Sequence, residues 1–391
     1  MSFDFSKRVN RKGSNSVKWD MVEDRFSKSD LLPMWVADSD WPTAPAIIEA
    51  IQKRSEHGIF GYTFPDKELK GIIVNWLKKH YKWDIKEEWI VFSNGVVPSL
   101  NIAINSLTNP GDEVVLQSPV YYPFYSAITN NGCQIVNNQL EESNLEYSFD
   151  FDDLREKLND TENYQSRAKA LILCNPHNPV GRVWKEDELK KLGEICVENN
   201  LTIISDEIHS DFIYDNNKHI PIASINNDLR ENTITFMAPS KSFNIAGLNS
   251  SFAIIPNKSL RKEFEVNKNG LVGSGNIFGL VAMKAAYSKG EEWLKEQLVY
   301  LEKNRDYAVD YINNKVSGIK TKKIEGSYLL WLDCRDLNLS QDELKDLFIN
   351  EIKVALDPGD WFGKGGKGFM RLNLACPREV LKEGLEKIKG V

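Results

Sequence analysis

Three polar residues follow short apolar runs of this sequence, and together they could bind and activate a cofactor. Asn178, Asp206 and Lys241 come in this order, each at or just beyond the end of a predicted buried strand. A lysine amine can hold an aldehyde as a Schiff base, a carboxylate can keep a pyridine nitrogen protonated, and an amide can bond to a ring hydroxyl. Pyridoxal 5'-phosphate needs these three functions, so the pattern predicts a site for that cofactor.

Each of the three residues also has an ordinary structural interpretation. Most lysines are solvated on the surface, aspartate is common at strand ends and helix N-caps, and asparagine before proline is typical of turns. The position of all three at the ends of neighbouring predicted strands favours the cofactor site.

A phosphate group has a predicted place in residues 93–98, which join a strand to a helix. Gly95 allows close approach of the backbone, and the N-terminus of the helix offers free amide groups to an anion. Ser240, next to Lys241, could add a hydroxyl. Many strand–glycine–helix turns look alike, so this signal depends on the other three residues.

Two further residues could act on a substrate. Tyr121 is either a core aromatic residue or a ring stacked on the pyridine face, with its hydroxyl near the reacting carbons. Arg371 lies in the predicted strand 369–374, and a buried arginine needs a partner. That partner is either the α-carboxylate of a substrate, held by two hydrogen bonds, or an acidic side chain in a structural salt bridge. The sequence leaves these two interpretations equal.

The elements that must position these residues alternate between strand and helix. Amphipathic stretches at 98–107, 122–131 and 185–199 predict helices. Strands that are apolar throughout, separated by helices, predict an α/β fold with a mainly parallel sheet covered on both faces. In such sheets ligands bind beyond the carboxyl ends of the strands. The predicted strands are 89–92, 113–117, 134–136, 170–174, 201–205, 233–237 and 251–255.

The pattern changes on either side of this region. Residues 1–45 read as an irregular N-terminal arm that joins the small domain, and residues 46–285 as the large domain that binds the cofactor. Residues 286–391 combine helices and strands in a smaller α+β domain. A long helical stretch, 277–314, is expected to link the two.

The composition excludes several classes of protein. The chain has 391 residues and a net charge of −7, from 49 basic and 56 acidic residues, which argues against nucleic acid as a partner. Its five cysteines are widely spaced without a CxxC pair, so we expect neither a disulfide framework nor a structural metal site. No apolar run is long enough to cross a membrane, and the first residues are polar. We therefore expect a cytoplasmic protein.

Four motifs resemble those of the fold-type I, pyridoxal phosphate-dependent aminotransferase superfamily (class I/II), in that family's order. They are Asn175-Pro-His-Asn-Pro179, Asp206-Glu-Ile-His209, Ser240-Lys-Ser-Phe-Asn244 and Arg371-Leu-Asn373. The resemblance covers essentially the whole chain. Within the superfamily the chain looks like the cystathionine β-lyase (carbon–sulfur lyase) branch, through Met34-Trp-Val-Ala-Asp38, Phe60-Gly-Tyr-Thr63 and Ser240-Lys-Ser-Phe-Asn-Ile-Ala-Gly247.

The resemblance implies the family's fold, with a seven-stranded sheet, and a role for each matching residue. Lys241, Asp206 and Tyr121 would be catalytic, and Ala37, Asn178 and Arg371 would bind the substrate. Tyr62 would reach the phosphate in the neighbouring subunit, which implies a homodimer. The residues implied to bind the cofactor are Val96, Val97, Tyr121, Asn178, Asp206, His209, Ser240, Lys241 and Tyr62.

Three positions depart from the aminotransferase pattern and suit the lyase branch better. His209 stands where many aminotransferases have tyrosine, Ala238 where a phosphate-binding serine is common, and Asn249 where a phosphate-binding arginine is common. The branch implies β-elimination of L-cystathionine, or of L-cysteine-type thioethers, to a thiol, pyruvate and ammonia, with a place in methionine biosynthesis and sulfur amino-acid metabolism.

Three other functions compete with this one. An aminotransferase would use the same residues, and only the resemblance to the branch separates the two. A pyridoxal phosphate-binding regulatory protein would not need the full catalytic set. A nicotinamide-dependent oxidoreductase would need a glycine fingerprint, and residues 273–278 lack its third glycine.

Overall fold

The computed structural model describes residues 3–159 and 167–390, and its largest sheet has seven strands. β10 runs antiparallel to both of its neighbours, and the other neighbouring pairs are parallel. Every one of the seven runs predicted from the sequence forms a strand of this sheet. In spatial order the strands are β2 (Ile90–Ser93), β10 (Ser251–Ile254), β9 (Thr233–Met237), β8 (Thr202–Asp206), β7 (Ala168–Cys174), β3 (Glu113–Leu116) and β4 (Gln134–Asn137).

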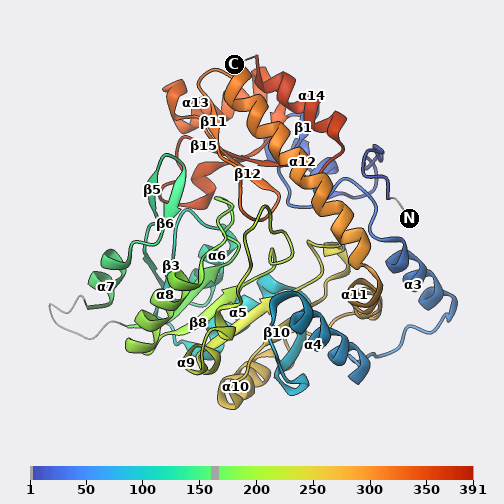
Figure 1. Cartoon of the computed structure of the whole chain (residues 1–391), viewed down its shortest axis with the longest axis vertical. Coiled ribbons are helices and arrows are strands. Elements are labelled where there is room, and N and C mark those ends of the chain that lie inside the picture. Colours follow the sequence, from blue (N-terminus) through green and yellow to red (C-terminus); the bar gives the residue numbers. More distant parts are fainter. Residues whose placement is uncertain (1–2, 160–166, 391) are drawn as a thin grey trace.

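Helices cover both faces of this sheet (Figure 1). Successive side chains of a strand point to opposite faces. Accordingly Val114 and Leu116 belong to one apolar core, and Val115 between them belongs to another. The first core is completed by α5 (Val96–Leu107), α6 (Pro123–Asn130) and α10 (Lys258–Lys268), and the second by α7 (Phe151–Asn159), α8 (Glu186–Glu198) and α9 (Asn227–Glu231).

A second, antiparallel sheet of four strands is formed by the C-terminal part of the chain. It lies at the upper end of the molecule in Figure 1, in orange and red, beside the helices of the same segment. Its strands are β11 (Lys320–Thr321), β12 (Leu329–Asp333), β15 (Phe369–Asn373) and β14 (Asp357–Pro358). The helices are α13 (Gln341–Asp346), which continues as a π-helix (Leu347–Ile352), and α14 (Arg378–Ile388).

The helical stretch predicted at 277–314 is two helices, α11 (Ile277–Lys289) and α12 (Glu291–Lys315). Gly290 separates them, and its N–H bonds to the carbonyl of Ala286 at 2.9 Å. A Cβ atom at this position would overlap the ring of Phe243. The packing against that ring therefore explains the glycine at the break.

The N-terminal arm is more regular than its sequence predicts. It contains two short helices, α1 (Val17–Asp20) and α2 (Val22–Phe26), and the strand β1 (Leu32–Pro33). These elements are too short to show a period. β1 pairs in parallel with β13 (Val354–Ala355) of the C-terminal part. The remaining α-helices and strands of the described residues are α3 (Pro45–Glu56), α4 (Lys67–Tyr81) and the hairpin β5 (Glu141–Ser143) to β6 (Glu146–Ser148).

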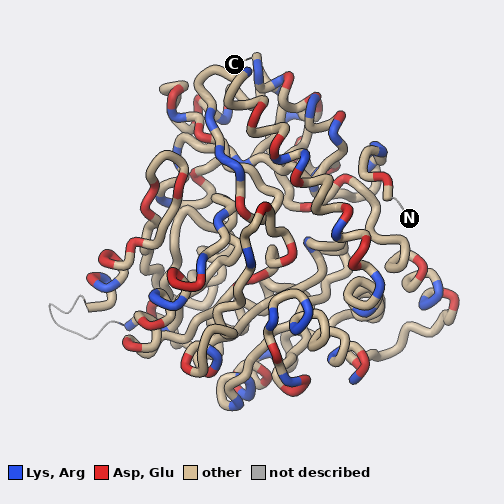
Figure 2. The backbone as a smooth tube through the Cα atoms, viewed as in Figure 1, with Lys and Arg blue, Asp and Glu red and all other residues tan. Residues whose placement is uncertain are grey.

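Charged residues of both signs are interspersed along the helices (Figure 2), so the net charge is spread over the molecule in this view. Among residues 3–159 and 167–390, no helix has both the length and the apolar character that a membrane crossing requires.

Candidate active site

Asn178, Asp206 and Lys241 meet at one cavity of about 220 Å³. Asn178 and Lys241 follow β7 and β9, and Asp206 is the last residue of β8; the three strands are neighbours in the large sheet. The parallel order of these strands brings their carboxyl ends to the same edge, which is why residues 28 and 35 positions apart in the sequence line one cavity. The grouping predicted from the sequence is thus present in the structure.

Lys241 is held by the N-terminal arm. Its Nζ donates to the carbonyl oxygen of Ala37 at 2.7 Å, and the hydroxyl of Tyr328 donates to the same oxygen at 2.9 Å. Burial lowers the pKa of Lys241 to about 8, against the charge of Asp38, which raises it. A lysine with this pKa has a substantial neutral fraction near neutral pH and can act as a nucleophile or a base.

Asp206 is buried without a cationic partner close enough for an ion pair among the residues the structure describes. It is 5% exposed, and its carboxylate accepts one hydrogen bond, from the backbone N–H of Ile208 at 3.1 Å. Burial raises the pKa of Asp206 to about 7. A protonated pyridine nitrogen would supply the missing cation, so this residue fits the predicted cofactor.

The N-terminus of α5 also faces the cavity, through Gly95, Val96 and Val97. The first N–H groups of a helix have no partner within it and attract anions. Neutral polar residues line the same cavity, namely Asn94, Ser240, Asn249 and Ser250. Lys241 is the one Lys or Arg among the lining residues, so a phosphate bound here would be held by neutral donors and the helix terminus.

Tyr121 and His209 complete the predicted lining. The ring of Tyr121 packs edge-on against Phe124, with 5.8 Å between centroids, and burial raises its pKa so that the hydroxyl keeps its proton. His209 Nδ1 lies 3.2 Å from the hydroxyl of Ser327, and burial lowers its pKa well below the usual value. Both side chains are therefore neutral at physiological pH.

Arg371 stands behind this lining and not within it. It is 2% exposed and forms an ion pair with Asp357, which matches the salt-bridge alternative left open by the sequence. Its Nη1 donates to the side-chain oxygen of Asn178 at 2.9 Å, so it still contacts the cavity through that residue. Sequence reasoning missed Asp357. The sequence shows only an acidic residue 14 positions before an arginine, and this spacing is too common to identify Asp357 as a partner of Arg371.

Tyr62 is the one predicted site residue that the structure places in open solvent. Its side chain is fully exposed, and so are large parts of Ile59, Phe60 and Phe64 on the same segment between α3 and α4. Tyr62 does not line the cavity of its own chain. Ala37, in contrast, lines it, and the arm brings it there.

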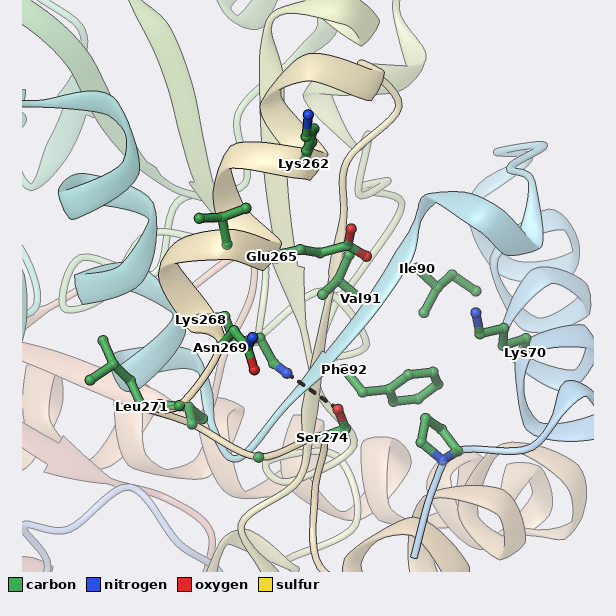
Figure 3. Close-up of a pocket in the computed structure, with 15 residues that line it drawn as sticks. Lys70, Ile90, Val91, Phe92, Lys262, Glu265, Lys268, Asn269, Leu271 and Ser274 are labelled. Atoms are coloured by element: carbon green, nitrogen blue, oxygen red, sulfur yellow. Dashed lines mark hydrogen bonds between the residues drawn. The ribbon is translucent and has the colours of Figure 1, made fainter.

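A larger hollow of about 860 Å³ lies beside the edge strand β2 (Figure 3). Lys268 Nζ donates to the hydroxyl of Ser274 at 3.2 Å across it. Lys70 and Lys262 also line it, together with the apolar Ile90 and Phe92. None of the predicted site residues belongs to this hollow.

Known proteins are similar to this chain over its full length. The cystathionine β-lyase PatB of Bacillus subtilis (strain 168) is 45% identical over 388 residues, which are 99% of each chain. The structure of cystalysin from Treponema denticola, which contains a pyridoxal 5'-phosphate cofactor, matches with a TM-score of 0.95 and 37% identity, covering 100% of this chain and 98% of that one. A C-S lyase from Staphylococcus hominis with bound pyridoxal phosphate matches with a TM-score of 0.92 and 34% identity over the same shares.

The family model for aminotransferases of class I and II matches residues 34–388, which include every residue of the cavity described above. The resemblance noted in the sequence is thereby confirmed, including the branch, since PatB is a cystathionine β-lyase and the Staphylococcus hominis protein is a C-S lyase. This chain belongs to the aminotransferase class I and II family.

Proposed function

We propose that this protein is a pyridoxal phosphate-dependent carbon–sulfur β-lyase that cleaves L-cystathionine or similar thioethers of L-cysteine. The observation that carries the proposal is the meeting of Lys241, Asp206 and Asn178 around one cavity that also holds the N-terminus of α5. The lyases among its relatives support the choice of reaction.

The cofactor's groups have matching partners among the lining residues. Lys241 would bind its aldehyde carbon, and Asp206 would pair with its ring nitrogen. Asn178 has its side-chain oxygen occupied by Arg371, so its Nδ2 group is the donor to the ring hydroxyl. Tyr121 would pack on the ring, and His209 would lie beside it. The amides of Val96 and Val97 and the hydroxyl of Ser240 would hold the phosphate.

The bound cofactor supplies an electron sink for the bond broken at the substrate α-carbon. Once the substrate amine has displaced it from the cofactor, the free amine of Lys241 would take the α-proton, the bond between Cβ and sulfur would break, and the sulfur would leave with a proton from Lys241 or Tyr121. Water converts the remaining three-carbon fragment to pyruvate and ammonia, and L-cystathionine yields homocysteine. Arg371, Asn178 and the Ala37 backbone orient the substrate carboxylate.

We also propose a homodimer in which Tyr62 of one subunit contacts the phosphate in the other. The exposed apolar segment around Tyr62 supports this, because such patches mark protein interfaces. Mixing Tyr62→Ala protein with Lys241→Ala protein is the test. If Tyr62 acts across the interface, hybrid dimers contain one intact site and regain activity that neither variant has alone. If the mixture stays inactive although hybrids form, this proposal fails.

The boundaries at residues 45 and 285 remain our proposal for the domains, supported by the separate sheets on either side. We further propose a cytoplasmic enzyme of methionine biosynthesis. All five cysteines are unpaired and buried, as is common in a reducing compartment.

The deciding experiment measures pyruvate released from L-cystathionine by purified protein, with and without an added 2-oxo acid. Release without the 2-oxo acid, abolished in Lys241→Ala, is the expected result. Turnover that requires the 2-oxo acid would identify an aminotransferase and refute the lyase. A cofactor-loaded protein without either activity would point to a regulatory role.

A further inference from the structure

Arg371 already has a carboxylate partner inside the protein. Asp357 on β14 stands directly opposite Arg371 on β15 in the sheet register, and its Oδ2 forms an ion pair with Nη2 of the arginine. Both side chains are almost completely buried, at 1% and 2% exposure. The pair is therefore part of the folded protein, and a substrate meets a guanidinium that is already neutralised.

The hydrogen bonds of this pair leave one polar atom of each residue without a partner among the described residues. Arg371 Nη1 donates to Asn178, and Nη2 donates to the carbonyl of Trp35 at 3.2 Å in addition to Asp357. Arg371 Nε and Asp357 Oδ1 are buried without a hydrogen-bond partner among the described residues. Buried polar groups of this kind are uncommon and call for an explanation. A ligand that accepts a hydrogen bond from Arg371 would explain why this arginine, beside a cavity, has an unused donor.

Other charges near Asp357 do not replace this partner. Arg25 acts on Asp357 only at longer range, since no hydrogen bond or ion pair joins them among the described residues, and its guanidinium lies over the ring of Trp361 at 4.0 Å. Tyr122 and Tyr121 lie close enough for Asp357 to raise their pKa further, beyond the effect of burial, so both stay neutral. Arg371 is thus the cation that Asp357 holds, and Asp357 is its only acidic partner within ion-pair distance among the described residues.

We propose that Asp357 shares Arg371 with the substrate and thereby sets the affinity of the site for the α-carboxylate. This inference rests on the proposed function, which makes Arg371 the carboxylate-binding residue. Two carboxylates on one guanidinium repel each other, so the substrate binds less tightly than it would to an unpaired arginine. In the free protein Asp357 removes the penalty of an uncompensated buried charge. Asp357 thus lowers the affinity of the site for a carboxylate and favours release of the ligand, while it keeps the buried arginine paired in the free protein.

The test compares the dissociation constants of glycine and ethylamine, which differ by the carboxylate, measured through the absorbance of the bound cofactor at one pH. The comparison needs no turnover. In Asp357→Asn we expect glycine to bind about tenfold tighter, while ethylamine is unchanged. Asp357→Glu keeps the charge and should keep the wild-type ratio. Asp357→Ser is a second neutral variant that should behave like Asp357→Asn, and it replaces that variant if the asparagine protein does not fold.

The matched control is Asp215→Asn. Asp215 pairs with the fully buried Arg305 at 2.8 Å, and it does not line the cavity. Both dissociation constants should be unchanged in this variant. Weaker or unaltered binding of glycine in the neutral variants at position 357 overturns the inference, because Asp357 would then only support Arg371. Equal affinity of the wild-type protein for glycine and ethylamine also overturns it, whereas the lyase proposal is judged separately by pyruvate release.

Discussion

The charge of Asp206 should lower the stability of the cofactor-free protein and raise that of the cofactor-loaded protein. The variant Asp206→Asn, which cannot ionise, separates these two effects. Burial raises the pKa of Asp206 from 3.8 to about 7. The unfolded chain therefore loses this proton first as the pH rises, and the folded state loses stability between about pH 4 and pH 7. This shift of about three pKa units lowers the free energy of unfolding by about 4 kcal/mol at pH 8, where both pKa values have been passed. At pH 5, where only the unfolded chain is ionised, the loss is about 2 kcal/mol.

The asparagine keeps the oxygen that accepts from Ile208 but cannot ionise. Without cofactor, Asp206→Asn should raise the midpoint of thermal unfolding by several degrees at pH 8 and by less at pH 5. The burial of the amide itself does not depend on pH, so the difference between the two pH values isolates the titration. With pyridoxal phosphate added, the midpoint should rise more in the wild type than in the variant, because only the carboxylate can pair with the ring nitrogen.

Asp306→Asn is the control of opposite sign. Although burial raises its pKa, hydrogen bonds from Lys323 and Arg305 hold the pKa of Asp306 below its usual value, so this substitution should lower the midpoint at pH 8. Equal changes in Asp206→Asn at pH 5 and pH 8 would refute the reasoning. So would a cofactor-induced rise that is as large in the variant as in the wild type.

Three more predictions concern other parts of the chain. In the cofactor-free protein, the rate at which Lys241 reacts with an acylating reagent should rise with pH with a midpoint near pH 8, because burial lowers its pKa. Mass spectrometry of the peptide that contains Lys241 measures this rate, and a midpoint near that of surface lysines would contradict the prediction. Gly359→Ala should destabilise the protein by at least about 2 kcal/mol, because a Cβ atom would overlap the carbonyl oxygens of Gly366 and Phe369. An unchanged midpoint of thermal unfolding would count against that packing. Lys18→Met should cost about 2 kcal/mol, because the buried Asp40 loses its bond of 2.7 Å to Lys18 but keeps its ion pair with Arg11. A smaller loss than in the exposed pair variant Lys78→Met would argue against this role.

The large sheet could be predicted from the sequence because its strands are buried on both faces. Such strands are apolar at nearly every position, as in β7, or buried along their whole length, as in β9. They are bounded by helices of clear period. The carboxyl ends of neighbouring parallel strands then meet, which is why Asn178, Asp206 and Lys241 could be grouped from the sequence alone. The short elements of the arm carry no such period, and they were missed.

The partner of Arg371 could not be predicted, because it depends on pairing between separate strands. Asp357 faces Arg371 only through the register of β14 and β15, which the loop between them sets. A shift of one residue would turn Asp357 to the other face of the sheet. Tyr62 illustrates a different limit, since a residue expected to act in a neighbouring subunit is fully exposed in a single chain.

The N-terminal arm connects the two ends of the site. The carbonyl of Ala37 accepts from Lys241, and the carbonyl of Trp35, two residues earlier, accepts from Arg371. The same segment is fixed by the side chain of Asn373, which donates to the carbonyls of Val36 and Asp38 at 2.6 and 2.7 Å. A displacement of the arm would therefore change the surroundings of the lysine and of the carboxylate-binding arginine together. For this reason Lys18→Met should weaken the binding of glycine as well as lower stability, although Lys18 does not line the cavity.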